Sequence, residues 1–444
     1  MRFLPHTADD VRSMLEVIGV DDVGALFSDV PGELRKTAGL DLAPGLSEIE
    51  VRRRLEGLAS RNTAAGQHCF IGAGAYPHFV PAAVDQILQR AEFYSAYTPY
   101  QPEVSQGTLQ AIFEFQTLVA MLLGMEVANA RMYDGASATA EAVLMALRMR
   151  NKRSRVLLSR ALHPQYRETV RTYTTGAGNF ELVDIPFDAT GRSDLDWLKR
   201  NLDEHVAAVV LGYPNFFGVV EDIGTASSLA HANDSVVISA TTEAVALGLL
   251  KAPGDLGVDI AVAEGQSLGI PMSYGGPGVG LFATRNDLVR MMPGRLVGEA
   301  YDGDGRRGYV LTLATREQHI RREKATSNIC TNQGLMALAF TVHVSLLGKN
   351  GIRRLAIANT RAAHAVVDNL KSRGWKTAFA APFFNEVVIR RGSAEKAWKT
   401  ACSKGVLAGV PLQRWYPELS DCLLLCATEV HDDHAIAALS EALA

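Results

Sequence analysis

The stretch that decides the fold is a strand–helix–strand pattern in the middle of the chain. It begins with Val206-Ala-Ala-Val-Val-Leu211, continues as a helical pattern over Ile223–Ala232, and ends with Ser235-Val-Val-Ile-Ser239. Short apolar β-rich runs without a polar face are typical of strands that are covered on both sides. Such runs, separated by helices of about ten residues, are typical of an open α/β sheet with helices on both faces.

The same alternation extends from about residue 125 to residue 290. It predicts four further strands, over Arg155–Ser159, Phe180–Val183, Asp259–Ala263 and Val279–Ala283. A long helix over Asn332–Leu347, followed by strands at Phe384–Ile389 and Leu423–Cys426, predicts a smaller C-terminal α+β domain. We therefore expect three parts: a helical arm at 1–65, a large α/β domain at 66–330, and the long helix with the small domain at 331–444.

Composition narrows the class of protein. Of 444 residues 48% are hydrophobic and 21% charged, and the net charge of −4 gives no basic footprint for nucleic acid. No apolar run reaches membrane-spanning length, and the first residues lack the apolar core of a signal peptide. The scattered histidines suggest no metal site. The cysteines, which form no CxxC pair, indicate core thiols in a reducing cytoplasm; they are Cys69, Cys330, Cys402, Cys422 and Cys426.

One loop–helix junction could bind an anion. In Asp134-Gly-Ala-Ser-Ala-Thr139 a helix starts with free backbone amides and with hydroxyls such as that of Ser137. Amides at a helix start attract phosphate. The alternative is an ordinary helix cap, because Asp, Ser and Thr begin most helices.

The order of parts resembles the aspartate-aminotransferase-like enzymes of fold type I, which use pyridoxal phosphate (PLP). In that fold the cofactor phosphate lies on such a helix start, a ring stacks on the pyridine, an Asp at a strand end pairs with the ring nitrogen, and a lysine forms the Schiff base. The resemblance implies that His163 occupies the place of the stacking ring, although a structural role at a helix start is the alternative.

Three motifs resemble the P-protein of the glycine cleavage system more closely. They are Tyr97-Thr-Pro-Tyr-Gln-Pro-Glu-Val-Ser-Gln-Gly107, Gly269-Ile-Pro-Met-Ser-Tyr-Gly-Gly-Pro-Gly278 and Thr315-Arg-Glu-Gln-His-Ile-Arg-Arg-Glu-Lys-Ala-Thr-Ser-Asn-Ile-Cys-Thr331. In one arrangement of this family two homologous chains form the enzyme and only the second carries PLP. The opening, Met1 to Pro31, is similar to the start of the first chain.

The resemblance also predicts what this chain lacks. Counting back from Ile270, the place of the Schiff-base lysine is Gln266, whose carboxamide cannot form an imine. The place of the acidic strand-end residue is Ser239, with Glu243 as the nearest carboxylate. We therefore expect a vestigial cofactor site at Ser137, His163, Ser239 and Gln266, with no covalent cofactor on this chain.

Two alternatives stay open. Of the eleven lysines, Lys251 and Lys324 lie near plausible site loops and could serve a freestanding PLP-fold lyase or aminotransferase. The chain could also be a regulatory homodimer that completes no active site.

The resemblance implies partners for this chain: a homologous PLP-bearing second subunit, a lipoylated H-protein, and glycine as the substrate. Five residues could line a cleft shared with the second subunit, although loop packing or a solvated helix face would explain them equally. These residues are Tyr97, Tyr100, Glu103, Arg316 and His319.

Overall fold

The computed structural model describes residues 5–39, 41–64, 66–330 and 333–444. Residues 1–4, with which the signal-peptide prediction begins, and Thr331, which ends the third motif, lie outside the described residues. The chain divides into two compact units, Met1–Ala65 and Gly66–Ala444.

The first unit is a series of short helices without a core. Helix α1 (Ala8–Ile18) begins with a capping box between Thr7 and Asp10 and ends at Gly19, which has a left-handed φ of 81°. A 3-10 turn and two more helices follow, at Val23–Phe27, α2 (Gly32–Thr37) and α3 (Glu48–Ala59). No described side chain of this unit is buried, so the unit cannot be stabilised by burying its own apolar surface.

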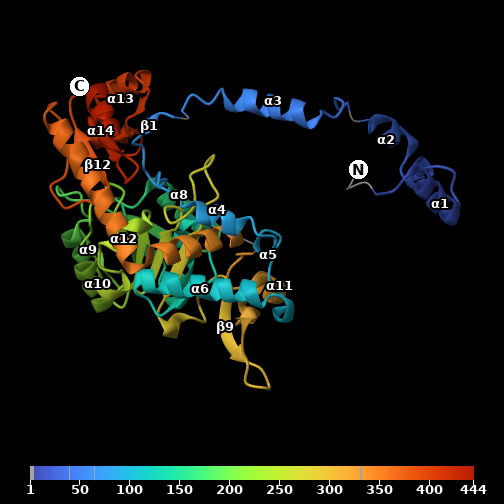
Figure 1. The fold of residues 1–444 in the computed structure, drawn as a ribbon. Helices are drawn as coiled ribbons and strands as arrows, with labels where there is room; N and C mark the ends of the chain where they lie inside the picture. The colour runs from blue at the N-terminus through green and yellow to red at the C-terminus, as the bar shows by residue number, and fades with distance from the viewer. Residues whose placement is uncertain (1–4, 40, 65, 331–332) are drawn as a thin grey trace. The chain divides into compact units, whose positions relative to one another are not determined.

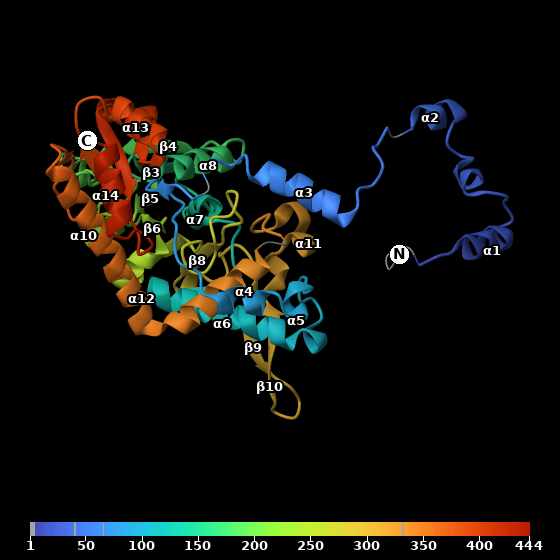
Figure 2. The ribbon, with the colours of Figure 1, turned by 45° about the horizontal axis from the view of Figure 1, so that its top comes forward.

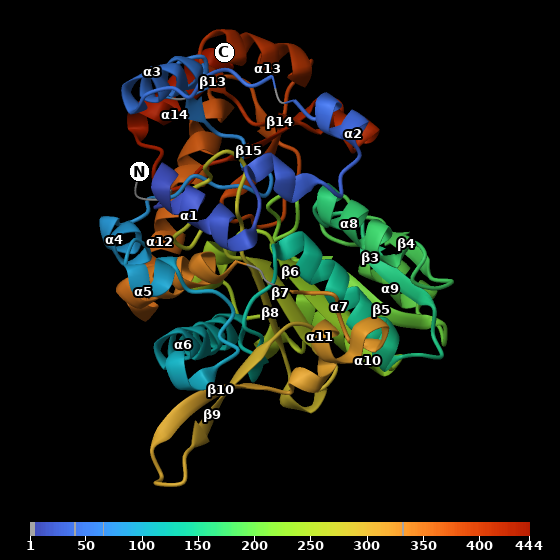
Figure 3. The same ribbon diagram turned by 90° about the vertical axis from the view of Figure 1, so that its right-hand side faces the viewer.

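The second unit is built around one seven-stranded sheet. Its strands lie in the order β2-β8-β7-β6-β5-β3-β4 (Figure 3). Strands β3 to β7 run parallel, whereas β8 is antiparallel to β7 and β2 is antiparallel to β8. The strand bounds are β2 (Val127–Ala128), β3 (Arg155–Ser159), β4 (Glu181–Ile185), β5 (Val206–Gly212), β6 (Val236–Thr241), β7 (Ile260–Glu264) and β8 (Gly280–Thr284).

Helices cover both faces of this sheet, as the alternation predicts. One apolar cluster joins α7 (Gly135–Met149) and α8 (Pro164–Thr174) to one face, and a second joins α6 (Gln106–Leu123), α9 (Leu195–Asn201) and α10 (Ile223–Ala232) to the other. Successive strand residues belong to opposite clusters: Val156 and Leu158 pack under α7, and Leu157 packs on the other side. The result is a three-layer fold (Figure 1).

Helix α12 (Gly334–Lys371) packs along α6 and α4 (Ala82–Leu88) and then leads to the small C-terminal sheet (Figure 1). That sheet has the order β11-β12-β15-β14 and, with its two helices, its own apolar cluster. Its elements are β11 (Lys376–Thr377), β12 (Glu386–Arg390), β14 (Val410–Pro411), β15 (Cys422–Cys426), α13 (Ala394–Ser403) and α14 (Asp433–Ala442). A separate strand pair joins β1 (His68–Cys69) to β13 (Val406–Leu407).

By length and composition alone, α12 could cross a membrane. However, Gly348 interrupts it with non-helical dihedral angles (φ 56°, ψ −179°), so two shorter helices meet there. Buried side chains in the first part of α12, such as Phe340 and Val344, belong to the core around the large sheet, and those near its end, such as Val366 and Leu370, belong to the core of the small domain. Packing inside the protein is sufficient to explain the apolar character of this helix.

Three sequence expectations differ from the structure. The sequence pattern predicts one helix over Ala82–Phe93, but the structure has two, α4, which ends at Leu88, and α5 (Ala91–Tyr94). Strand β6 runs two residues beyond Ser239, to Thr241. The charged stretch after Arg285 contains a hairpin, β9 (Leu296–Tyr301) and β10 (Arg307–Thr312), which projects from the rest of the unit (Figure 2). The short helix α11 (Gln318–Arg321) follows it.

Candidate functional site

A cavity of about 290 Å³ lies where β7, the starts of α7 and α8, and the glycine-rich loop Gly269–Gly278 meet. Its lining includes Asp134, His163, Glu264 and Gln266. Ligands of open α/β sheets bind at the carboxyl ends of the strands, and Glu264 is the last residue of parallel strand β7. The cavity is therefore the position at which this fold would hold a cofactor.

Backbone groups of Tyr76 and Ile270 fix the side chain of Gln266 by hydrogen bonds. Its side-chain oxygen accepts from the Tyr76 amide at 3.1 Å, and its nitrogen donates to the Tyr76 carbonyl at 3.3 Å and to the Ile270 carbonyl at 2.7 Å. Both ends of this buried carboxamide are thus satisfied. The residue joins the loop before α4 to the glycine-rich loop, and it presents no nucleophile to the cavity.

The start of α7 faces carboxylates. Glu264 accepts from the Gly135 amide at 2.9 Å, and the side chain of Asp134 accepts from the Ser137 amide at 2.7 Å. The Ser137 hydroxyl in turn accepts from the Asp134 amide at 3.2 Å, which completes a capping box. This hydroxyl therefore already has a partner within the helix start. Burial raises the pKa of Glu264 to about 7, although the amides of Gly135, Val279 and Gln266 lower it.

His163 caps α8 rather than facing a ligand with a free nitrogen. Its Nδ1 accepts from the Gln165 amide at 3.2 Å, so Nε2 carries the proton and donates to the Ala73 carbonyl at 2.8 Å. Burial lowers the pKa of this imidazole, which keeps the ring neutral. Its ring also packs edge-on against Phe216, with 4.9 Å between the ring centroids.

Ser239 lies inside β6 rather than at its end. It pairs with Leu211 on one side and Ala261 on the other, is fully buried, and is not among the residues that line the cavity. Its hydroxyl has no hydrogen-bond partner among the described residues. The strand ends at Thr241, so the prediction that Ser239 lies at the strand end is wrong.

A buried charged network near this cavity was missed in the sequence. His78 lies between two carboxylates, with 3.0 Å from Nε2 to Glu243 and 2.8 Å from Nδ1 to Glu429. Burial lowers the pKa of His78, but the two carboxylates outweigh burial and raise it to about 10. The network joins the loop after β1 to the ends of β6 and β15, and it ties the large and small sheets together.

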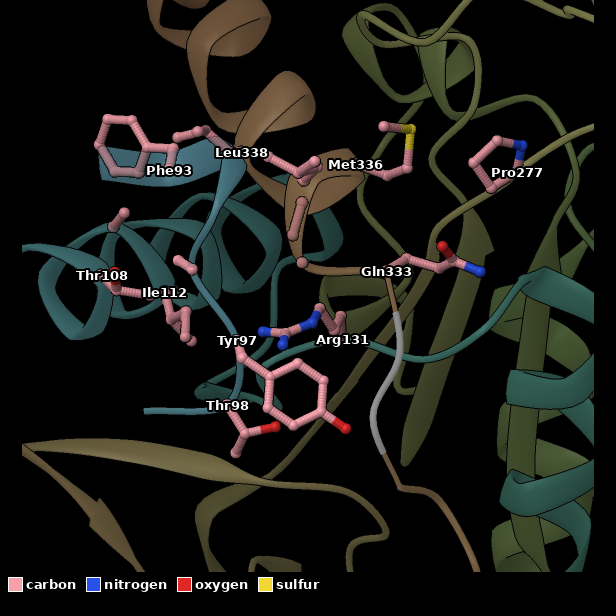
Figure 4. A pocket seen from close by; sticks show the side chains of 15 residues that line it. Phe93, Tyr97, Thr98, Thr108, Ile112, Arg131, Pro277, Gln333, Met336 and Leu338 are labelled. Carbon is pink, nitrogen blue, oxygen red and sulfur yellow. The ribbon is translucent and has the colours of Figure 1, made fainter. Parts of the chain in front are cut away.

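A second region contains the first and third motifs. A cavity of about 340 Å³ is lined by apolar residues and by Tyr97, Thr98, Arg131 and Gln333. Figure 4 shows the guanidinium of Arg131 beside Tyr97 and Ile112. Burial, and then the nearby Arg295, lower the pKa of Arg131 to about 10. Two neighbouring guanidinium groups make this region a basic one.

Tyr100 and His319, predicted as cleft residues, are brought together. Arg295 donates to the Tyr100 hydroxyl at 3.0 Å and to Glu317 at 3.0 Å, and the rings of Tyr100 and His319 meet edge-on with centroids 5.7 Å apart. These residues line one cavity of about 370 Å³. Arg295 also contacts Thr98 at 3.4 Å, which connects this cavity with the one around Tyr97.

The other predicted positions lie elsewhere. Arg316 donates to the backbone carbonyls of Met292, Leu313 and Gly294, so its guanidinium holds loops. Glu103 is exposed on a 3-10 turn at Pro102–Val104. Lys251 and Lys324 are exposed, and no lysine is among the described residues that line the Gln266 cavity.

Comparison with known proteins places the chain in a family. The family model for the glycine cleavage system P-protein matches residues 1–443. The chain belongs to the glycine cleavage system P-protein family. It is 53% identical over 439 residues to a "Probable glycine dehydrogenase (decarboxylating) subunit 1" from Anaeromyxobacter dehalogenans, covering 98% of each chain. A protein of the same name from Carboxydothermus hydrogenoformans is 46% identical over all of this chain and 99% of its own length.

Solved structures agree with this placement. A P-protein of the glycine cleavage system, determined in an inhibitor-bound form, superposes with a TM-score of 0.90 at 41% identity, covering 99% of this chain and 98% of that one. A cysteine desulfurase from Escherichia coli has a TM-score of 0.62 at 17% identity, covering 85% of this chain and 94% of its own. The fold is therefore fold type I of the PLP-dependent enzymes, as the order of parts predicts.

The residues of this P-protein family member do not fit PLP in the cavity at Gln266. A carboxamide bound to the backbone takes the place of the amine, and carboxylates face the helix start that would hold the phosphate. Strand β6 ends in a threonine, which has no carboxylate to pair with a ring nitrogen. Across the described ranges, no group of three or more His, Cys, Asp or Glu side chains could hold a metal ion.

The sequence did not predict the roles of Glu264, Arg295 and His78. Only Glu264 had a local signal, because it ends a buried parallel strand, where ligand contacts concentrate.

Proposed function

We propose that this chain is the cofactor-free subunit 1 of a glycine-decarboxylating enzyme and that a homologous second subunit carries the PLP. The observation that carries the proposal is Gln266, whose buried carboxamide is fully bonded to the backbone where the family's lysine would stand. No other amine among the described residues reaches that cavity, which argues against a freestanding PLP enzyme.

In the assembled enzyme, PLP on the partner supplies the electron sink for the carbanion left when glycine loses CO₂. The aminomethyl group then passes to the lipoyl arm of the H-protein. This chain's residues would form part of the wall of the shared cleft and exclude water from it. The chain would act in the cytoplasm, without nucleic acid or membrane as a partner.

The region around Tyr97 and Tyr100 is the best candidate for that wall. Both side chains are exposed in the single chain, at 72% and 51%, although large aromatic groups are usually covered. Arg295 donates a hydrogen bond to the Tyr100 hydroxyl, and its guanidinium carbon lies 5.4 Å from the centroid of the Tyr100 ring. Such fixed aromatic and cationic groups suit a site for a small carboxylate substrate. Glu103, Arg316 and His319 complete the proposed set, with Arg316 acting through the loops that it holds.

Purification of this chain alone and together with a homologous PLP-bearing chain tests the proposal. We expect no imine absorbance when PLP is added to the single chain, and glycine-dependent CO₂ exchange only when both chains are present. Borohydride reduction that links PLP to a lysine of this chain would contradict the proposal. Replacement of Lys251 and of Lys324 by Ala then shows whether either residue holds the cofactor.

Two variants test the cleft. Tyr100→Phe removes the hydroxyl that accepts from Arg295 but keeps the ring, and we expect a raised KM for glycine or a lowered kcat in the assembled enzyme. The matched control is Tyr301→Phe, which removes an exposed tyrosine hydroxyl that bonds to Glu299 on the projecting hairpin. Equal effects of the two substitutions would assign Tyr100 to packing alone.

A further inference from the structure

The carboxylate of Glu264 occupies a ready-made anion site. Its two oxygens accept three backbone amides, those of Gly135 at 2.9 Å, Gln266 at 3.0 Å and Val279 at 2.9 Å. Several amides that converge on one anion, with one of them at a helix start, are the arrangement by which proteins bind phosphate. Here the bound anion belongs to the chain itself.

Two glycines pack closely against Glu264. A Cβ atom on Gly135 would lie 2.2 Å from the Tyr166 hydroxyl and 3.0 Å from the Cβ of Glu264. On the other side, a Cβ atom on Gly278 would lie 2.8 and 3.0 Å from the two Glu264 oxygens. The helix start and the glycine-rich loop therefore pack closely against Glu264, whose carboxylate occupies three amides that could otherwise bind a phosphate group.

Three of the amides at the α7 start already have acceptors. The Gly135 amide donates to Glu264, the Ser137 amide to the side chain of Asp134, and the Ala138 amide to the Asp134 carbonyl. A phosphate arriving here would meet two carboxylates in a buried site and would have to displace one of them. Like charges in a buried site repel strongly because little water screens them.

We infer that the side chain of Glu264 takes the place of a cofactor phosphate at these amides and makes this pocket a poor site for phosphate-bearing ligands. This inference rests on the proposed function, in which the chain carries no PLP, and adds a second barrier that is independent of the missing amine. Restoring a lysine at position 266 alone would therefore not restore recognition of the PLP phosphate.

An anion-rescue experiment tests the inference without any enzyme activity. Glu264→Ala leaves three amides without their acceptor, and inorganic phosphate can then take its place. We expect phosphate to raise the melting temperature of this variant by about 3 °C or more over potassium chloride at equal ionic strength. The unchanged chain should show no such difference, nor should Glu141→Ala, which removes a buried carboxylate farther along the same helix.

A phosphate effect that is equal in the unchanged chain and in Glu264→Ala, or absent from both, would overturn the inference. Should Glu264→Ala fail to fold, Glu264→Ser keeps one hydrogen-bond acceptor and replaces it in the same assay. The unchanged chain gives an independent test. If phosphate raises its melting temperature more than potassium chloride does, and Gly278→Ala abolishes this rise, phosphate binds in this pocket and the inference is refuted.

The cofactor itself gives the second test. We compare PLP with pyridoxal, which lacks the phosphate, on Gln266→Lys and on the double variant Glu264→Ala/Gln266→Lys. We expect Gln266→Lys to bind the two aldehydes equally, and the double variant to prefer PLP by about tenfold or more, because charge-assisted bonds to the phosphate are then available. A preference for PLP in Gln266→Lys alone refutes the role of Glu264, whereas an imine in the unchanged chain refutes the proposed function instead.

Discussion

Removal of the His78 side chain should destabilise this protein more than the loss of any exposed ion pair. The ring is 2% exposed and lies between Glu243, also 2% exposed, and Glu429, 16% exposed. His78→Ala leaves two buried carboxylates facing each other without the cation between them. Breaking a buried ion pair by removing one partner costs about 3–5 kcal/mol. With an m-value of about 3 kcal/mol/M, the urea midpoint would fall by about 1–2 M.

The contribution of His78 to stability should decrease as the pH rises. The pKa of His78 is about 10 in the folded chain against 6.5 for an unperturbed histidine, so the folded state binds the proton more tightly. Its stabilising contribution is complete below pH 6.5 and is lost as the pH rises through about 10. The third titratable group near the ring, His343, is neutral in this range, since burial and then His78 lower its pKa to about 4.

Urea unfolding of the unchanged chain and of His78→Ala at several pH values measures both effects. The unchanged chain should lose stability across the interval between the two pKa values, and the difference from the variant should shrink there. The control is Arg90→Ala, which breaks an ion pair with Glu92 whose side chains are 60% and 64% exposed, and we expect it to change the urea midpoint little because water and salt screen such a pair. If His78→Ala costs no more than Arg90→Ala, the charged network contributes nothing to stability and the reasoning is wrong.

Three further predictions concern single positions. Gly348→Ala should lower the free energy of unfolding by about 1–3 kcal/mol, because Gly348 has a φ of 56°. Gly107→Ala should raise it by about 0.5–1 kcal/mol, because Gly107 lies inside α6 with open space around it. Urea unfolding measures both changes. Arg295→Met should lower the unfolding free energy by about 3–5 kcal/mol because Glu317, 7% exposed, loses its partner, and a loss below 1 kcal/mol would contradict this. Cys330, the exposed thiol, should react with a thiol reagent far faster than the two buried cysteines of β15, and bound second subunit should slow its labelling.

The ends of helices and the alternation of elements could be predicted because their causes are local. Thr7 and Gly19 bound α1, and Gly124 ends α6 in a left-handed conformation, as the sequence indicates. The buried strands β5 and β7 are also readable, because strands covered on both faces need continuous apolar runs. These signals depend on neighbours in sequence and not on the tertiary fold.

The features that were missed depend on contacts between distant residues. His78 meets Glu243 and Glu429 across 165 and 351 positions of sequence, so no local pattern indicates the pairing. The displaced end of β6 is set by pairing with Gly212 and Ala263, which lengthens the strand beyond Ser239. The β9–β10 hairpin did have a local signal, because Asp302-Gly-Asp-Gly-Arg306 is a turn between two alternating runs.

The exposed apolar side chains of the N-terminal helical arm should affect how fast the chain is degraded in a cell. Apolar side chains on three of its helical segments, among them Ile18, Phe27 and Leu55, are more than half exposed. In a newly made chain that has not assembled, these exposed side chains can be bound by chaperones and proteases, which recognise exposed apolar segments. Copies in which these groups stay exposed would then be degraded faster than copies in which they are buried.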